Sequence, residues 1–330
     1  MQEWNAGALL KVSGGYWQSC ALHAGIKLDV FTAIDTRSMQ PEDVAARIHA
    51  DPDATSRLLD ALAAMGLLAK ESGRFSNTDV SLRHLCKSSK NYLGYIMLHH
   101  HYLMDSWSRL DAAVLEGKPV GEQTQAREDT REAFLMGMYN NAMLQAPELV
   151  ERIDLTGRRT LLDMGGGPGT YAIQFCLRNP KLTATVFDLP TTRPFAEETI
   201  ARFGLSGRIE FEPGNYLETT LPRHFDVVWM SHVLHSQGYG VCREMIRKAV
   251  AALDPGGLLL IHDFYLNEHK DGPPLPALFS LNMLVRTQEG RSYSDREVRD
   301  MMEEAGLQKV RRLSYESPSQ SGVLMAVKPE

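Results

Sequence analysis

The sequence lacks the cysteine clusters and the long hydrophobic runs that mark several classes of protein. The 4 cysteines among its 330 residues are far apart, with no CxxC pair and no spacing typical of a zinc site. No stretch approaches the roughly 18 apolar residues that a membrane-spanning helix needs. The amino terminus, MQEWNAGALLKVSGG, has no apolar signal-peptide core. We therefore expect a cytoplasmic protein with reduced thiols.

The chain also lacks an excess of basic residues. Its formal net charge is -6, so its bulk electrostatics favour neither nucleic acid nor anionic lipid. Hydrophobic residues make up 43% and charged residues 23%, which is the balance of an ordinary globular protein that can bury sizeable cores. For a chain of this length, we expect about two domains.

The first third of the chain is predicted to be helical, with one small hairpin. Apolar residues recur every three to four positions within 16–34, which predicts a buried helix face. The residues of that face are Trp17, Ala21, Ala24 and Leu28. Pro41 and the pair Asp51–Pro52 are typical of the first turns of two more helices, and 67–78 has the pattern of two short strands around a Ser–Gly turn. Together these elements have the outline of a winged helix.

A winged helix suggests DNA binding, but the charges argue against it. The helix that begins at Asp51–Pro52 carries one arginine, Arg57, against three aspartates. A recognition helix needs cationic or amide side chains that face the bases and phosphates. We therefore favour a module for packing and dimerisation, with a ligand-responsive transcription regulator as the alternative.

Two groups of histidines raise the question of a metal site. Successive helix residues point about 100° apart, so the adjacent histidines at 99–101 cannot chelate an ion from one face. His232 and His235 lack a third ligand at zinc-like spacing nearby. We predict that the protein holds no metal.

The second half of the chain alternates short apolar runs with helical spans. Strands separated in this way need crossover connections, which predicts an α/β fold with a doubly wound, Rossmann-like parallel sheet. The predicted strands are Thr160–Met164, Leu182–Asp188, Arg208–Phe211, Phe225–Met230 and Leu258–Asp263, followed by an antiparallel hairpin of Gln308–Tyr315 and Gly322–Val327. We expect a helical dimerisation domain over 1–110, connecting helices that line a pocket over 111–150, and a catalytic domain over 151–330.

The first of these strands runs directly into a glycine loop, DMGGGPG, at 163–169. Glycine lets the backbone turn sharply and lets a ligand approach the main chain. The dinucleotide fingerprint would need a glycine at position 170, where this chain has Thr170. Asp163 precedes the loop, and its carboxylate suits a ligand with an ammonium and a sulfonium group better than a pyrophosphate.

Polar residues also end the next two strands. Asp188 can accept hydrogen bonds from both hydroxyls of a ribose. Asn215 can bind an adenine edge, and the ring of Tyr216 can stack on adenine. Each has an ordinary structural alternative, since Asp188 could cap a helix and Tyr216 could be core. All of them follow consecutive strands, where open α/β sheets bind ligands.

The motifs DMGGGPG, FDLP, PGNY and WMSHVLHS, in this order, resemble the S-adenosylmethionine-dependent O-methyltransferases of the caffeate/acetylserotonin type. The resemblance extends to the amino-terminal half and so covers nearly the whole chain. It implies a homodimer built by intertwined amino-terminal helices and a winged-helix module that does not bind DNA. It also implies S-adenosylmethionine as cofactor, with contacts at Gly165, Asp188, Asn215, Tyr216 and Ser231. We add Asp163, Gly167 and Leu189, from the same strand ends, to the expected cofactor site. Members of the family usually have Asp at the position of Asn215.

The resemblance assigns the general base to His235. A phenol has a pKa near 10 and imidazole one near 6.5, so complete proton transfer in water would cost about 5 kcal/mol. The histidine can instead take the proton as the acceptor oxygen attacks.

The carboxylate partner of the base is left open. Asp263 stands where the plant enzymes have one glutamate, and their second glutamate would align near Ser292. Glu289, three residues away, is the alternative partner. Relatives commonly have Asp where this chain has Ser236.

The expected acceptor is a small aromatic molecule with a hydroxyl group. Methionine and aromatic side chains suit a flat ring, although such residues at helical spacing are more often core. The candidates are Phe134, Met138, Trp107, Phe279 and Met283. The alternatives on the same scaffold are N-methylation, C-methylation and chemistry without methyl transfer.

Overall fold

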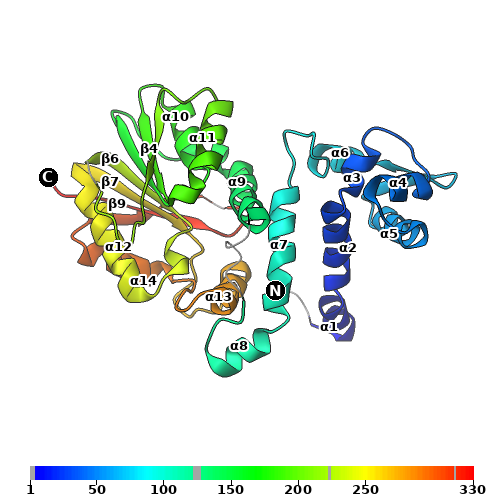
Figure 1. The fold of residues 1–330 in the computed structure, drawn as a ribbon. Coiled ribbons are helices and arrows are strands. Elements are labelled where there is room, and N and C mark those ends of the chain that lie inside the picture. Colours follow the sequence, from blue (N-terminus) through cyan, green and yellow to red (C-terminus); the bar gives the residue numbers. More distant parts are fainter. Residues whose placement is uncertain (1–3, 122–127, 222–223, 316) are drawn as a thin grey trace. The chain divides into compact units, whose positions relative to one another are not determined.

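The computed structural model describes residues 4–121, 128–221, 224–315 and 317–330 (Figure 1). The chain forms two compact units. One consists of Met1–Tyr102 with Glu128–Asn140, and the other of Leu103–Arg127 with Asn141–Glu330. No helix in the described part of the chain combines the length and the apolar character that crossing a bilayer requires.

The amino-terminal unit is helical, with one two-stranded sheet. Its elements are α1 (Ala6–Ser13), α2 (Tyr16–Lys27), α3 (Val30–Ile34), α4 (Pro41–Ile48), α5 (Pro52–Ala64), β1 (Leu68–Glu71), β2 (Arg74–Asn77), α6 (Asp79–His84) and parts of α7 (Gly94–Trp107) and α9 (Glu128–Glu151). The predicted hairpin is confirmed, since β1 and β2 pair antiparallel. Asp51 caps α5 by accepting a hydrogen bond from the Ala54 backbone N–H at 2.8 Å.

The buried face predicted for 16–34 is partly wrong. Trp17 is 69% exposed and Leu28 is 43% exposed. The helix ends at Lys27, because Asp29 adopts a φ of 59° and redirects the chain into α3. The core of this unit instead gathers Phe31, Leu59 and Phe75 from α3, α5 and β2.

The second unit contains the predicted Rossmann-like sheet, with seven strands. They are β3 (Thr160–Met164), β4 (Thr183–Asp188), β5 (Ile209–Pro213), β6 (Phe225–Ser231), β7 (Leu253–Asp263), β8 (Gln308–Arg312) and β9 (Gly322–Val327). The order is β5-β4-β3-β6-β7-β9-β8. The first five are parallel, while β9 is antiparallel to β7 and to β8, so the predicted terminal hairpin is confirmed.

Helices cover both faces of this sheet. The remaining elements are α8 (Leu110–Glu116), α10 (Thr170–Arg178), η2 (Pro190–Thr192), α11 (Arg193–Arg202), η3 (Leu234–Ser236), α12 (Tyr239–Ala252), α13 (Pro274–Arg286) and α14 (Asp295–Glu304). One core packs α10, α11 and the end of α9 on one face, and a second core packs α12 and α14 on the other (Figure 1). The strand order reverses between β3 and β6, and such a reversal is where open sheets bind ligands.

Candidate active site

The polar residues singled out from the sequence lie at or just beyond the carboxyl ends of neighbouring strands. Met164 pairs with both Phe187 and Met230, so β3 ends beside β4 and β6. Ser231 pairs with His262, which places the end of β6 beside the end of β7. The structure therefore brings the glycine loop, the end of β4 and the two ends of β6 and β7 to one edge of the sheet.

The glycine loop requires glycine for two separate reasons. Gly165, Gly167 and Gly169 have φ values of 74°, 54° and 77°, which L side chains rarely adopt. A Cβ atom on Gly165 would also lie 2.5 Å from Cγ1 of Val233 and 3.5 Å from the ring of Tyr216. Val233 therefore fills the space that a side chain at Gly165 would need, with the Tyr216 ring close by.

Asp163 lies beneath this loop rather than on its surface. Its side chain is buried and accepts a hydrogen bond from the Ala172 backbone N–H at 3.2 Å, at the start of α10. Burial raises the pKa of Asp163 to about 7. In this position the Asp163 carboxylate connects the end of β3 to the first turn of α10. A direct contact between Asp163 and the cofactor stays a prediction.

Asp188 connects the loop to β4. Its Oδ2 accepts a hydrogen bond from the Gly167 backbone N–H at 2.8 Å, and its Oδ1 accepts from the Leu189 N–H at 2.6 Å and the Thr192 hydroxyl at 3.1 Å. Burial raises the pKa of Asp188, and these hydrogen bonds oppose that effect. Asp188 is not an N-cap, since Leu189 takes that position in η2 without a side-chain cap. Oδ1 already accepts two hydrogen bonds, whereas Oδ2 accepts one and has a second lone pair for a ribose hydroxyl.

Asn215 and Tyr216 follow β5 in a tight turn. The Asn215 side-chain oxygen accepts a hydrogen bond from the Leu217 N–H at 3.0 Å, and Lys248 donates to the Tyr216 backbone oxygen at 3.0 Å. The half-buried Tyr216 ring lies near Gly165. The turn therefore places an aromatic face over the glycine loop.

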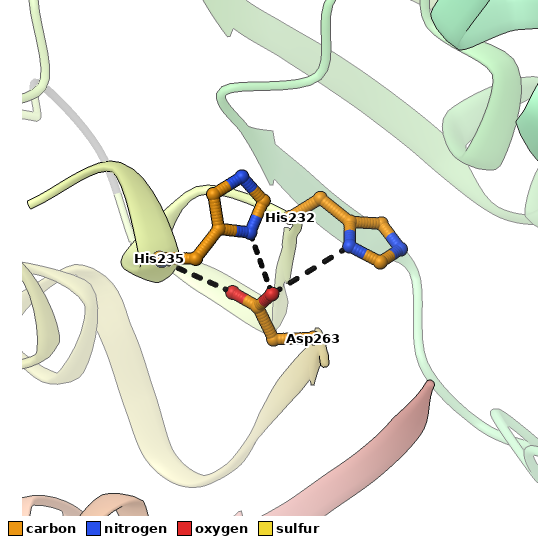
Figure 2. Close-up of side chains that lie close together, drawn as sticks. All are labelled: His232, His235 and Asp263. Carbon is orange, nitrogen blue, oxygen red and sulfur yellow. Dashed lines mark hydrogen bonds and ion pairs between the residues drawn. The ribbon is translucent and has the colours of Figure 1, made fainter. Parts of the chain in front are cut away.

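His235 and Asp263 form a buried hydrogen-bonded pair (Figure 2). His235 lies in η3, directly after β6, and Asp263 is the last residue of β7. The His235 Nδ1 atom lies 2.7 Å from Oδ1 of Asp263, and the His235 backbone N–H donates to Oδ2 at 3.3 Å. The Phe264 N–H adds a hydrogen bond to Oδ1 at 2.8 Å. Of the two carboxylates considered from the sequence, the structure pairs His235 with Asp263, while Glu289 lies beside the backbone of Gly238.

The charge of Asp263 is retained despite its burial. Burial alone would raise the pKa of Asp263, but attraction to His235 and His232, together with the hydrogen bond to His235, holds the pKa well below its usual range. Because the ionised carboxylate can only accept, the His235 proton sits on Nδ1 and the lone pair is on Nε2. The pair therefore presents a basic nitrogen on the side of the ring away from Asp263.

Aromatic rings surround the base. The Phe279 ring meets His235 edge to face at 4.7 Å, and the Phe264 ring lies 4.5 Å from Phe279. His235 itself is 9% exposed. The site is poor in water on this side.

Ser236 and Ser292 take the two positions where the family resemblance leads one to expect carboxylates. The Ser236 hydroxyl donates to the Val233 carbonyl at 2.8 Å, and the buried Ser292 hydroxyl donates to the Pro276 carbonyl at 2.8 Å. Both hydroxyls are used within the backbone framework, so neither replaces a second carboxylate at the base.

Ser231 is held by a histidine that the sequence analysis did not single out. The Ser231 hydroxyl lies 3.0 Å from Nδ1 of His262, and the Nε2 of His262 lies 2.8 Å from the Ser321 hydroxyl. His262 is fully buried, and burial lowers its pKa well below the ordinary value. The sequence feature that could have identified His262 is its position next to Asp263 in a strand predicted to be buried.

The acceptor candidates divide between the two units. Phe279 contacts the base, and α13, which carries it, also carries the buried Met283. The Trp107 indole donates to the Asn282 side-chain oxygen at 2.9 Å. Phe134 and Met138 belong to the amino-terminal unit, where Phe134 packs against His99.

A glycine loop and polar strand ends at a sheet switch point, beside a buried imidazole with a carboxylate partner, fit a methyltransferase. The family model of the O-methyltransferase domain matches residues 107–308, and that of the O-methyltransferase dimerisation domain matches 10–87. The chain belongs to the O-methyltransferase family, and its cofactor is S-adenosylmethionine.

Three relatives illustrate the range of the family. The chain is 32% identical to the 3-hydroxy-5-methyl-1-naphthoate 3-O-methyltransferase of Streptomyces sahachiroi, over 97% of this chain and 94% of that protein. It is 29% identical to the N,N-dimethyltransferase OxyT of Streptomyces rimosus, over 98% and 97%. The solved structure of human N-acetylserotonin methyltransferase with S-adenosylmethionine superposes with a TM-score of 0.87, at 25% identity, over 100% of this chain and 99% of that one.

We predict that Gly165→Ala weakens the binding of S-adenosylhomocysteine by at least about tenfold, which is roughly 1.4 kcal/mol. The added methyl group would collide with Val233 beneath the Tyr216 ring. Calorimetric titration measures the affinity. Gly204→Ala is the matched control, because Gly204 has a similar φ of 68° with no atom within 4 Å of the added carbon. Equal affinities for both variants would mean that the cofactor does not bind over this loop.

Proposed function

We propose that this O-methyltransferase acts on a hydroxyl group of a small aromatic molecule, with His235 as general base and Asp263 as its partner. The observation that carries this proposal is the 2.7 Å contact between Nδ1 of His235 and Oδ1 of the buried Asp263. A relative that methylates a hydroxynaphthoate supports an aromatic acceptor.

The residues at the sheet edge fit the cofactor. At Gly167, a Cβ atom would meet no described atom within 4 Å, so the backbone there is open to a ligand. Asp188 offers a lone pair of Oδ2 to the ribose, and Asn215 and Tyr216 supply an amide and an aromatic ring for the adenine. We assign Gly167, Leu189 and Ser231 to the same binding edge. When bound, S-adenosylmethionine supplies a methyl group on a positively charged sulfur.

The protein's own part in the reaction is to hold the acceptor and to remove its proton. Nε2 of His235 accepts the hydroxyl proton as the acceptor oxygen attacks. The imidazolium formed in this way is stabilised by the adjacent Asp263 carboxylate, which also keeps the ring oriented. Phe264 and Phe279 exclude water, so the interaction between the two charges is little screened.

The acceptor pocket is assigned to aromatic and methionine side chains. Phe279 lies against the base, and the hydrogen bond between Trp107 and Asn282 fixes an indole beside α13. We place a flat acceptor ring against Phe279, with Trp107 and Met283 nearby. The contribution of Phe134 and Met138 stays a prediction.

Methylation of nitrogen is the second candidate reaction. It is favoured by the similarity to an N,N-dimethyltransferase along nearly the whole chain. Labelled S-adenosylmethionine incubated with matched phenols, anilines and carbon acids distinguishes the two reactions. Transfer to phenols alone supports the proposal, and transfer to amines alone overturns it.

The oligomeric state, the cellular location and the partners of the enzyme are proposed from the family match and the sequence, not from the site. The dimerisation domain at 10–87 supports a homodimer through the amino-terminal helices. A cytoplasmic location, and the absence of metal and nucleic-acid partners, stay predictions from the sequence.

We predict that His235→Gln lowers kcat by about 10²–10⁴-fold, because the amide cannot accept the acceptor proton. The affinity for S-adenosylhomocysteine should stay within about twofold, since the change leaves the glycine loop and Asp188 intact. Steady-state kinetics and calorimetry give the two values.

His224→Gln is the matched control. His224 is an exposed histidine that lies 3.4 Å from Asp254 on the surface of the same unit, and its loss should leave kcat unchanged. A His235→Gln enzyme that keeps most of its turnover would refute the general-base assignment.

Asp263→Asn should lower kcat by about 10²–10⁴-fold, because an amide neither stabilises the imidazolium nor enforces the proton on Nδ1. Without the carboxylate, His235 also holds a proton less tightly, so the acid-side midpoint of kcat/KM should move to lower pH. A pH profile with an unchanged midpoint would show that Asp263 does not act on the base.

A further inference from the structure

His232 lies at the same carboxylate as the base and has no assigned role. It follows β6 directly, and its φ of 56° is unusual for a residue other than glycine. Its backbone N–H donates to the carbonyl of His262 at 2.8 Å, which fixes the turn. A strained residue held in this way at a site is a reason to look for a function.

The imidazole of His232 faces Asp263 through a nitrogen that has no hydrogen-bond partner among the described residues. Its Nδ1 is buried, lacks a hydrogen bond and lies 3.6 Å from Oδ1 of Asp263. This distance is too long for a good hydrogen bond but within reach of an ion pair. Figure 2 shows His232 and His235 on either side of the carboxylate, each turned toward it through Nδ1.

The packing of His232 restricts which groups it can influence. Its ring lies 4.6 Å from Phe264 and 4.5 Å from His262, and 5.9 Å from the ring of His235. The titratable groups that the structure places against it are Asp263 and His262 from β7 and His235 from η3. Both nitrogens of His262 are held by serine hydroxyls, and its burial keeps it neutral. The coupling of His232 is therefore to His235, through Asp263.

We propose that His232 is a positioning residue for the reaction: it shares the Asp263 carboxylate with His235 and thereby weakens the hold of that carboxylate on the base. This inference rests on the proposed function, in which His235 takes the acceptor proton. Oδ1 of Asp263 already accepts hydrogen bonds from His235 and from the Phe264 N–H, so His232 acts through charge and not through a further hydrogen bond. A positive charge on His232, 3.6 Å from this oxygen, competes with the imidazolium of His235 for the same carboxylate.

The test is a histidine titration of the full-length protein by NMR, with ring signals assigned from single variants, alongside the pH profile of kcat/KM. In His232→Phe, His235 is the imidazole that remains beside Asp263. His235 should then bind a proton about threefold to tenfold more tightly than in the wild type. The midpoint of its titration and the acid-side midpoint of kcat/KM should both move to higher pH. A role in packing alone would lower the rate without moving either midpoint.

His232→Asn is the second variant, because asparagine tolerates a positive φ and carries a polar atom near the position of Nδ1. It never becomes charged, so its midpoint should lie between those of the wild type and His232→Phe. His269→Phe, at an exposed histidine of the same unit, is the control and should not move the midpoint. A His235 titration that is unchanged, or moved to lower pH, in both His232 variants would overturn the proposal.

The titration needs no acceptor, so its outcome is separate from that of the proposed function. If His235→Gln retained turnover while the His232 variants shifted the titration, the base assignment would fail and the sharing of Asp263 would stand. If His235→Gln abolished turnover and the titration did not move, the base would stand and His232 would have no part in tuning it.

Discussion

The site depends on one buried contact, between the imidazole of His235 and the carboxylate of Asp263. A buried carboxylate is costly unless its oxygens are paired. Asp263 meets this condition with two backbone N–H groups and the His235 ring. The hydrogen bond to Asp263 also fixes the tautomer of His235. The same arrangement therefore stabilises the carboxylate charge and leaves the Nε2 lone pair of His235 facing away from Asp263.

Topology explains why this contact lies beside the cofactor edge. The strand order reverses between β3 and β6, and such a reversal is where open α/β sheets bind ligands. The glycine loop follows β3 and η3 follows β6, and Val233 packs directly against Gly165. The segment that carries His235 and the glycine loop are thus in contact through Val233, and a change at either is expected to reach the other.

The fold could be predicted from the sequence because its signals are local. Short apolar runs between helical spans define the parallel sheet, and the glycines of 163–169 mark a turn that needs positive φ values. The choice between Asp263 and Glu289 could not be made in this way. It depends on how α13 and the loop after it pack against η3, which brings Glu289 to the backbone of Gly238 and leaves Asp263 to the base.

Other residues were missed because only the packed structure gives them a role. Phe264 and His262 look like ordinary members of a buried strand end, and Asn282 looks like a polar residue on a helix. In the structure, the Phe264 ring packs near the rings of His232 and His235, and His262 is hydrogen-bonded to Ser231. The error at Trp17 and Leu28 has a related cause, since helical spacing identifies an apolar face but does not show what covers it.

The most direct measurement is a crystal structure of the enzyme with S-adenosylhomocysteine and an acceptor together. The account predicts that the acceptor oxygen lies about 2.6–3.2 Å from Nε2 of His235, with the sulfur of the nucleoside on the far side of that oxygen from the ring. An acceptor oxygen that faces a different side chain, with His235 still bonded to Asp263, would contradict it.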